Sequence, residues 1–474
     1  MLVAALSRLL SATILRHALS VLLADGAAAA AAAAAVAAAG PTLDDVEGRL
    51  TFPAVEGRDV QGLANPSGFL RMPVSRHSAN TSHLTANLTE RSITELAKRW
   101  GREHVNALAS GVVYVMDLSI GTPPQTVQVV IDTGAYQVWV NQSVTSYYPS
   151  ASQTASYIGP NMTLQYGTGA LYGQMWSDTV QIAMFQVPTV RFLVALFTTI
   201  IYPGILGLAY TPPTSPFTGL ISAMVQMKYI NAPIFSLGLG SLDNDYGEVI
   251  FGGVNRARFA DQLEPLDIWP PTSQQTNGPL YLVNMTSLGW TEPGGPSHTV
   301  TPSNFSLNVL IDTGSSLSYL PWDAFQLLID SVNAVHGVDN YYVVNCKYQG
   351  MNGTFDFGFN HGKMVIRVPY KEFIYSFAPD ICFLGVQPTT STAVLGSTFL
   401  RAAYGAYDLS APLRRPENLF SPRAGLLTPL RRRYIVAFDQ ESDVVWMGQF
   451  KNCGDEVVSV GRAGLDTGNV VGAC

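Results

Sequence analysis

Two stretches of the chain carry the same acidic tripeptide behind an apolar run. Asp-Thr-Gly begins at Asp132 within VVIDTGAYQVWV (129–140) and again at Asp312 within VLIDTGSSLSYL (309–320). Two carboxyl groups held around one water share a proton at acidic pH, because both cannot ionise easily when they are close. The ionised partner can then take a proton from the water while the protonated partner polarises an amide. The repeat therefore predicts a hydrolytic pair that requires neither a metal nor a covalent intermediate.

The residues that follow the two aspartates indicate how such a pair would be supported. Thr133 and Thr313 are expected to satisfy buried backbone groups of the opposite loop, because such groups are almost always hydrogen-bonded. Gly134 and Gly314 are expected to let that backbone approach closely, since glycine has no side chain. Each aspartate would then lie at the edge of its own domain, next to the other.

The elements that must position these loops are predicted to be strands. Short apolar runs broken by Gly, Pro and Asn fill the chain from Gly111 onward, which is typical of an all-β protein. A glycine-containing apolar segment follows each Asp-Thr-Gly copy, GILGLAY at 204–210 and TAVLGSTFL at 392–400. Few helices are expected, the best being 218–227 and 322–334. The repeated unit is thus a whole β domain.

Composition narrows the class of protein further. The chain has 474 residues, of which 47% are hydrophobic and 13% are charged, and its net charge is -7. It can bury substantial cores, and it lacks the basic footprint of a nucleic-acid binder. The sequence has no Cys/His cluster and no Gly-rich phosphate loop. We therefore expect no metal, no cofactor and no nucleic-acid partner.

Further motifs match one known family: DLSIGTPPQ ahead of the first loop, FGGVNRARF in mid-chain and VLGSTFLRAAY near the end. With both Asp-Thr-Gly loops, they make the chain resemble a pepsin-like aspartic protease of the secreted fungal or yapsin-like type, from about Gly111 to Gly448. The resemblance implies an all-β bilobal fold, with two similar lobes flanking a central substrate cleft. It also implies Asp132 and Asp312 as the catalytic dyad for peptide or protein substrates.

The same resemblance assigns roles to other residues. It implies that QYGTGALYG is a flap hairpin that closes over the peptide, with Tyr166 at its tip and Gly167 and Thr168 contacting the substrate backbone. Trp139 matches the tryptophan that pairs with the flap tyrosine. Four more residues are implied to contact the substrate or the carboxylates: Gly134, Gly314, Ser315 and Ser316.

The two loops differ at the residue after glycine. Members of this family mostly carry Ser or Thr there, but the first copy has Ala135 where the second has Ser315. A hydroxyl that donates to a carboxylate favours its ionised form and lowers its pKa. Since Ala135 has no hydroxyl, the sequence predicts an acid limb of the pH profile at higher pH than in members with both hydroxyls, and Ala135→Ser should lower it.

The N-terminal part of the chain indicates export and processing. Residues 1–40 form an apolar leader that favours a secretory signal, with an organelle transit peptide or a start outside the real protein as alternatives. Residues 41–99 are polar and poor in strand pattern, and a dibasic pair predicts a pro-segment cut after Arg99. The N-terminal lobe, with Asp132 and the flap, is then assigned to 100–279 and the C-terminal lobe to 280–474.

Cysteines and possible glycosylation sites suit the same compartment. Four cysteines lie in the last third of the chain and allow three disulfide connectivities, and the family resemblance implies a bond between Cys346 and Cys382. No apolar run after the leader is long enough to span a membrane. We expect a secreted monomer, with the cell wall or the vacuole as alternatives. The Asn-X-Ser/Thr acceptors are Asn80, Asn87, Asn141, Asn161, Asn284, Asn304 and Asn352.

A basic stretch at 404–433 breaks the pattern of the C-terminal lobe. It holds six arginines and four prolines, and two similar phrases, AAYGAYDL and RRYIVAFDQ, mark its ends. An exposed loop, a translated stretch absent from the working protein, and a basic docking loop are all open interpretations.

Two functions follow from the residues and the resemblance. One is an acid endopeptidase made as a zymogen. The other is a catalytically silent protein of the same fold that binds or inhibits, which would be expected to have lost an aspartate or the flap tyrosine. Asp132, Asp312 and Tyr166 are all present, and this favours the enzyme.

Overall fold

The structure is a computed structural model of the chain. It describes residues 68–78, 112–143, 145–167, 169–183, 185–200, 202–242, 246–269, 280–337, 341–378, 380–409, 444–461, 465 and 471–474. All of these belong to one compact unit that spans 59–474. The expected leader (1–40) and the expected cleavage site at Arg99 lie outside the described residues.

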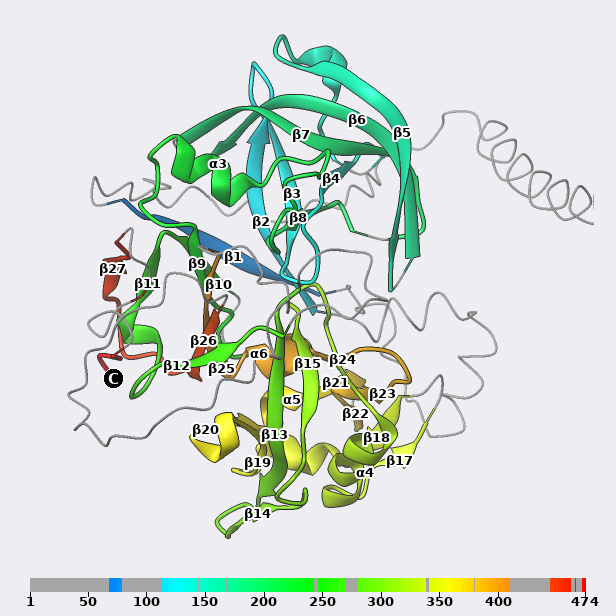
Figure 1. The fold of residues 1–474 in the computed structure, drawn as a ribbon. Coiled ribbons are helices and arrows are strands. Elements are labelled where there is room, and N and C mark those ends of the chain that lie inside the picture. Colours follow the sequence, from blue (N-terminus) through cyan, green and yellow to red (C-terminus); the bar gives the residue numbers. More distant parts are fainter. Residues whose placement is uncertain are drawn as a thin grey trace, which may run out of the picture. The chain divides into compact units, whose positions relative to one another are not determined.

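The described residues are mostly β-strand, as the sequence predicted (Figure 1). The largest sheet has 13 strands in the order β12-β26-β25-β9-β10-β1-β2-β3-β8-β4-β7-β6-β5. Its strands are β1 (Leu70–Ser78), β2 (Val112–Ile120), β3 (Gln125–Asp132), β4 (Val138–Asn141), β5 (Ser156–Tyr166), β6 (Gly169–Ile182), β7 (Phe185–Thr198), β8 (Gly204–Gly207), β9 (Ile234–Gly238), β10 (Tyr246–Phe251), β12 (Glu264–Asp267), β25 (Ala403–Asp408) and β26 (Val444–Gln449).

The second large sheet has eight strands, in the order β20-β19-β13-β15-β24-β16-β23 with β14 paired to β13. Its strands are β13 (Leu282–Thr291), β14 (Ser297–Thr299), β15 (Leu307–Ile311), β16 (Ser318–Leu320), β19 (Thr354–Phe359), β20 (Met364–Pro369), β23 (Val386–Pro388) and β24 (Ala393–Leu395). Two smaller sheets contain β17 (Val335–His336), β18 (Tyr342–Val344), β22 (Ile381–Leu384) and β21 (Ile374–Ala378) in one, and β11 (Gly253–Asn255) and β27 (Val457–Ser459) in the other.

The sequence repeat appears as the same strand arrangement in both large sheets. In the first, β3 is parallel to β8, β8 is antiparallel to β4, and β4 is parallel to β7. In the second, β15, β24, β16 and β23 repeat these pairings in the same order. The glycine-containing segments GILGLAY and TAVLGSTFL supply β8 and β24. Each therefore lies between the strand that leads into an Asp-Thr-Gly loop and the strand that leaves it.

The strand that ends at Asp132 is buried on both faces. Val129 and Ile131 pack into the main core, and Val130 packs on the opposite side in a cluster that includes Trp139. This double burial accounts for the continuous apolar run before the aspartate, because a strand with one wet face would alternate polar and apolar residues. It also holds the end of β3 rigidly.

Helices are short and few among the described residues. They are α3 (Leu220–Gln226), α4 (Trp322–Ser331), α5 (Tyr370–Phe373) and α6 (Ser397–Leu400), with 3-10 turns η1 (Pro149–Ala151), η2 (Arg256–Arg258), η3 (Cys346–Gly350) and η4 (Asn360–Gly362). The two predicted helices correspond to α3 and α4. Helix α4 ends before the predicted 334, and Asn333 just beyond it has a left-handed backbone with φ of 50°.

The expected pro-segment contains a strand that its sequence did not suggest. Strand β1 pairs with β10 on one side and with β2 on the other. Its inward residues Leu70, Met72 and Val74 are buried in the main core. The alternation of apolar and polar residues is present in LRMPVSRHS, but Pro73 and the polar surroundings conceal it.

Strands from both expected lobes share the largest sheet. Strand β25, from the C-terminal lobe assigned to 280–474, pairs with β9 from the N-terminal lobe and with β26. The first residues of the expected insertion at 404–433 are part of β25, which continues to Asp408. Regular pairing therefore extends into the start of that segment, and the rest of it, from 410, lies outside the described residues.

Candidate active site

The two Asp-Thr-Gly loops meet through their threonines. The backbone N–H of Thr133 donates to Oγ1 of Thr313 (3.1 Å), and the N–H of Thr313 donates to Oγ1 of Thr133 (3.0 Å). Each hydroxyl also donates across to the opposite strand, to the carbonyl of Ile311 or of Ile131, at 2.8 Å in both cases. All these groups are buried, so the four bonds fix the two loops against each other.

Each aspartate lies at the end of its strand with its carboxylate held by its own loop. Asp132 is the last residue of β3, and Asp312 follows β15 directly. They are 5% and 9% exposed. The N–H of Gly134 donates to Oδ1 of Asp132 (2.7 Å), and the N–H of Gly314 donates to Oδ1 of Asp312 (2.8 Å). The two carboxylates therefore have matching local supports.

Each carboxylate also lies directly against the glycine of the opposite loop. A β-carbon on Gly134 would be 2.7 Å from Oδ1 of Asp312, and one on Gly314 would be 2.6 Å from Oδ1 of Asp132. Such distances are well below van der Waals contact. Both loops consequently require glycine at this position for the carboxyl groups to come together.

The two halves of the pair are electrostatically unequal. The hydroxyl of Ser315 donates to Oδ2 of Asp312 (2.6 Å). Asp132 accepts from the backbone N–H groups of Gly134 and Ala135, and its side-chain partner is Asp312. Burial, the charge of Asp312 and hydrogen bonding to Asp312 together raise the pKa of Asp132 well above its usual range. Two carboxyl groups this close can share one proton, and their titration belongs to the pair.

The carbonyls of both loops are held by segments that follow β8 and β24. The N–H of Ala209 donates to the carbonyl of Ala135 (2.9 Å). In the second repeat, the N–H groups of Ser397 and Thr398, at the start of α6, donate to the carbonyls of Ser315 (2.8 Å) and Ser316 (3.2 Å). Ser316 is itself buried, with 8% of its surface exposed.

The predicted flap and its tryptophan partner also meet. Tyr166 is the last residue of β5, and its ring lies 6.4 Å from that of Trp139, centroid to centroid, at 53°. Burial, and then the charge of Asp132, raise the pKa of the Tyr166 hydroxyl. Gly167 is exposed in the turn after β5, and Thr168 lies outside the described residues.

Two tyrosines that the sequence analysis did not single out lie near the aspartates. Burial, followed by the charges of Asp132, Tyr319 and Asp312, raises the pKa of Tyr202 to about 12. Burial and the charge of Asp312 likewise raise the pKa of Tyr319. Tyr319 lies in the apolar return after the second loop, and Tyr202 lies just before GILGLAY. Only their positions beside the repeated segments could have indicated a role near the aspartates, because single tyrosines in a β protein are usually core residues.

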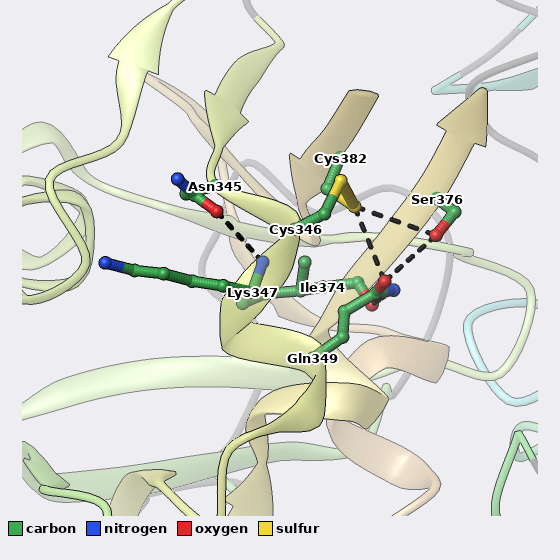
Figure 2. The surroundings of a disulfide bond; sticks show 7 residues. All are labelled: Asn345, Cys346, Lys347, Gln349, Ile374, Ser376 and Cys382. Atoms are coloured by element: carbon green, nitrogen blue, oxygen red, sulfur yellow. Dashed lines mark hydrogen bonds between the residues drawn. A yellow bond between two sulfur atoms is a disulfide. The ribbon is translucent and has the colours of Figure 1, made fainter. Parts of the chain in front are cut away.

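The Cys346–Cys382 disulfide joins η3 to β22 (Figure 2), with an S–S distance of 2.11 Å. Gln349 bridges the neighbouring strand: its side-chain amide donates to the carbonyl of Ile374 (2.8 Å), and its Oε1 accepts from the hydroxyl of Ser376 (2.9 Å). This cluster ties η3 to the four-stranded sheet.

A second disulfide links Cys453 to Cys474. Among the described residues, no group of three or more His, Cys, Asp or Glu side chains could hold a metal ion. A search of the same residues for helices found none with the length and apolarity that a membrane crossing requires.

Comparison with known proteins places this geometry in a family. Residues 113–413 match the model of the family described as eukaryotic aspartyl protease. The chain is 30% identical over 336 residues to the probable aspartic-type endopeptidase opsB of Aspergillus oryzae, covering 63% of this chain and 66% of that protein, just under two thirds of its length. It is 31% identical over 327 residues to gastricsin of Macaca fuscata fuscata, covering 63% of this chain and 81% of that protein. The chain therefore belongs to the eukaryotic aspartyl protease family and is an aspartic-type endopeptidase of the pepsin-like kind.

Proposed function

We propose that the protein is a secreted acid endopeptidase in which Asp132 and Asp312 activate one water molecule. The observation that carries the proposal is the pair itself. Two buried carboxylates from equivalent loops lie against each other's glycines, and the pKa of Asp132 is raised well above its usual range. Such a pair retains one proton over the acidic range in which the other carboxylate is ionised.

The asymmetry of the pair assigns a role to each aspartate. Asp312, which accepts from Ser315 and Gly314, is the ionised partner and takes a proton from the water as the water oxygen attacks the peptide carbonyl carbon. Asp132 gives its proton to the carbonyl oxygen, forming a neutral diol. When the diol collapses, Asp312 passes its proton to the departing nitrogen and Asp132 recovers a proton from the diol. The titration belongs to the pair as a unit.

The residues around the dyad are suited to an extended peptide. Gly134 and Gly314 present backbone without side chains beside the carboxylates. Tyr166 and Gly167 end the flap hairpin above Trp139. We assign to these residues, with Thr168 and Ser316, the positioning of the substrate backbone, because extended peptides bind mainly through main-chain hydrogen bonds.

We further propose that the protein is made as a zymogen whose pro-segment includes β1. This strand is hydrogen-bonded on both sides and buries its apolar face. Its Arg71 is paired with Glu248 (2.5 Å) and Asp455 (2.6 Å). Cleavage after Arg99 would leave β1 bound only by these noncovalent contacts.

The activity is tested on the secreted, processed protein with a denatured protein substrate at acidic pH. Pepstatin should abolish cleavage, and Asp132→Asn and Asp312→Asn should each lower kcat by at least about 10³-fold, since each variant removes one half of the proton relay. Circular dichroism of both variants controls for folding. Cleavage that persists in either variant, or in the presence of pepstatin, would show that another site is responsible.

A further inference from the structure

The flap sheet carries a glycosylation motif on its outer face. In β5 the residues Met162, Leu164 and Tyr166 point inward, where they pack against the cluster that contains Trp139. Alternate residues of a strand point to opposite faces. Asn161 and Thr163, the first and third residues of the motif Asn-Met-Thr, are therefore on the outer face, and both are exposed.

Two exposed aromatic rings lie beside this motif. Thr163 is directly opposite Tyr172 on β6, and Tyr172 is directly opposite Phe197 on β7. The side-chain amide of Asn161 contacts the hydroxyl of Tyr172. Tyr172 is 42% exposed and Phe197 is 67% exposed. Leu196, the bulge residue next to Phe197, is 44% exposed and extends the apolar patch.

The other acceptor motifs have different surroundings. Asn141 is buried, and its side-chain oxygen accepts from the N–H of Ser143 (3.0 Å). The side-chain amide of Asn284 donates both to Ser306 (2.8 Å) and to Asn308 (2.9 Å). A folded chain could not bury a glycan at Asn141, whereas Asn284 is half-buried with its amide engaged by two side chains. Asn304 and Asn352 are exposed, whereas Asn80 and Asn87 lie outside the described residues.

We propose that Asn161 is N-glycosylated and that its glycan covers the patch formed by Tyr172, Leu196 and Phe197. The inference rests on the secretion included in the proposed function. In the reaction, the amide nitrogen of Asn161 loses a proton and bonds to the first sugar carbon of an oligosaccharide carried on a lipid diphosphate. The bond from that carbon to the diphosphate oxygen breaks, and the lipid diphosphate leaves with the electron pair.

The exposed aromatic rings of the patch are better suited to contact with a sugar than with water. Exposed aromatic faces beside one another are uncommon on secreted monomers unless something covers them, and the C–H faces of a hexose can pack on aromatic rings through dispersion contacts. The inner face of the same hairpin, with Tyr166 and Trp139, is on the opposite side. A glycan at Asn161 would therefore protect the flap without entering the site at Asp132 and Asp312.

The site is tested by expressing the full chain in a eukaryotic secretory host. The secreted protein is digested with peptide N-glycosidase in heavy-oxygen water, so that each asparagine that carried a glycan becomes a labelled aspartate detectable by mass spectrometry. We expect label at Asn161, Asn304 and Asn352. Thr163→Val should abolish label at Asn161, whereas Thr163→Ser should retain it, because either hydroxyl completes the motif.

A separate measurement tests whether the glycan covers the patch. Asn161→Gln should raise the fluorescence of a hydrophobic dye bound to the protein by about twofold or more, since it uncovers the aromatic rings. Asn352→Gln, which removes a glycan elsewhere, should leave the signal unchanged. Unchanged dye binding in Asn161→Gln would show that the glycan does not cover the patch. Label at Asn304 and Asn352 but not at Asn161 would show that Asn161 is not glycosylated, although the protein is secreted. Absence of label at every asparagine would contradict both the glycosylation of Asn161 and the proposed secretion.

Discussion

The carboxylate of Asp312 lies so close to the backbone of Gly134 that a β-carbon there would be only 2.7 Å from Oδ1. The loop cannot shift easily, because the adjacent Thr133 is hydrogen-bonded to Thr313 of the opposite loop. Gly134→Ala should therefore displace the carboxylate and lower kcat by at least about 10²-fold, the cost expected for a misplacement near 1 Å. Steady-state kinetics on a peptide substrate measure this.

Gly350→Ala is the matched control for this substitution. Gly350 ends η3, and a β-carbon there would have no heavy atom within 4 Å. Its kinetics should equal those of the unmodified protein. If Gly134→Ala kept full activity as well, the two carboxylates would not depend on the close approach of the loops.

The asymmetry between Ala135 and Ser315 predicts two different changes in the pH profile. The two aspartates titrate as a pair, and the raised pKa of Asp132 is expected to contribute mainly to the alkaline limb. In Ala135→Ser, a hydroxyl donating to Asp132 would favour its ionised form, lower its pKa and move the alkaline limb to lower pH. In Ser315→Ala, Asp312 would lose the 2.6 Å hydrogen bond to its ionised form. Because the two carboxyl groups titrate as a pair, loss of this bond should move the acid limb of the profile to higher pH.

These shifts are measured as kcat/KM against pH with a peptide that has no titrating group in the range. Maximal kcat should stay within about tenfold of the original, because neither side chain takes or gives a proton in the reaction. Movement of the acid limb alone in Ala135→Ser would reverse the assignment of the proton to Asp132. The sequence alone attached Ala135 to the acid limb, and that prediction would stand if only the acid limb moved.

The repeat made the fold and the core of the site predictable. Two buried strands ending in Asp-Thr-Gly, each followed by a glycine-containing strand, correspond to the equivalent pairings β3-β8-β4 and β15-β24-β16. Because β pairing within each unit is determined by local apolar runs and tight loops, a duplicated pattern indicates a duplicated sheet.

The parts that escaped prediction depend on partners distant in sequence. Strand β1 is stabilised by β10 and β2 rather than by its own propensity, so a short segment with a proline did not indicate it. Tyr202 is far from both aspartates in sequence and gains its relation to them only in the folded protein. The inequality of the two carboxylates was suggested by Ala135, but the raised pKa of Asp132 depends on burial and on the charge of the other loop in three dimensions.

The pairing of β1 predicts how the processed protein behaves. After cleavage at Arg99, the peptide that contains β1 should remain bound at low salt and dissociate more readily at high salt, which screens the ion pairs of Arg71 with Glu248 and Asp455. Size-exclusion chromatography at the two salt concentrations, followed by mass spectrometry for residues 70–78, detects it. In Arg71→Gln the peptide should leave at a lower salt concentration.

Arg191→Gln is a suitable control for charge removal, since Arg191 lies on β7 and away from β1. It should not alter the salt concentration at which the peptide is released. A secreted protein that begins before Leu70 and keeps β1 covalently attached would contradict the assignment of this strand to the pro-segment.

The ends of β25 and β26 predict the effect of removing the basic segment between them. The two strands are antiparallel neighbours, and Asp408 is paired with Val444. Deleting 411–441 would leave a connection of about four residues, a common hairpin length. Shortening the connection about eightfold should stabilise the fold by about 2 kcal/mol, at about 0.6 kcal/mol per doubling of loop length. Urea denaturation and acid protease assays check both properties. Unchanged or higher activity would show that the segment is dispensable, whereas loss of activity with intact folding would show that it contributes to substrate binding.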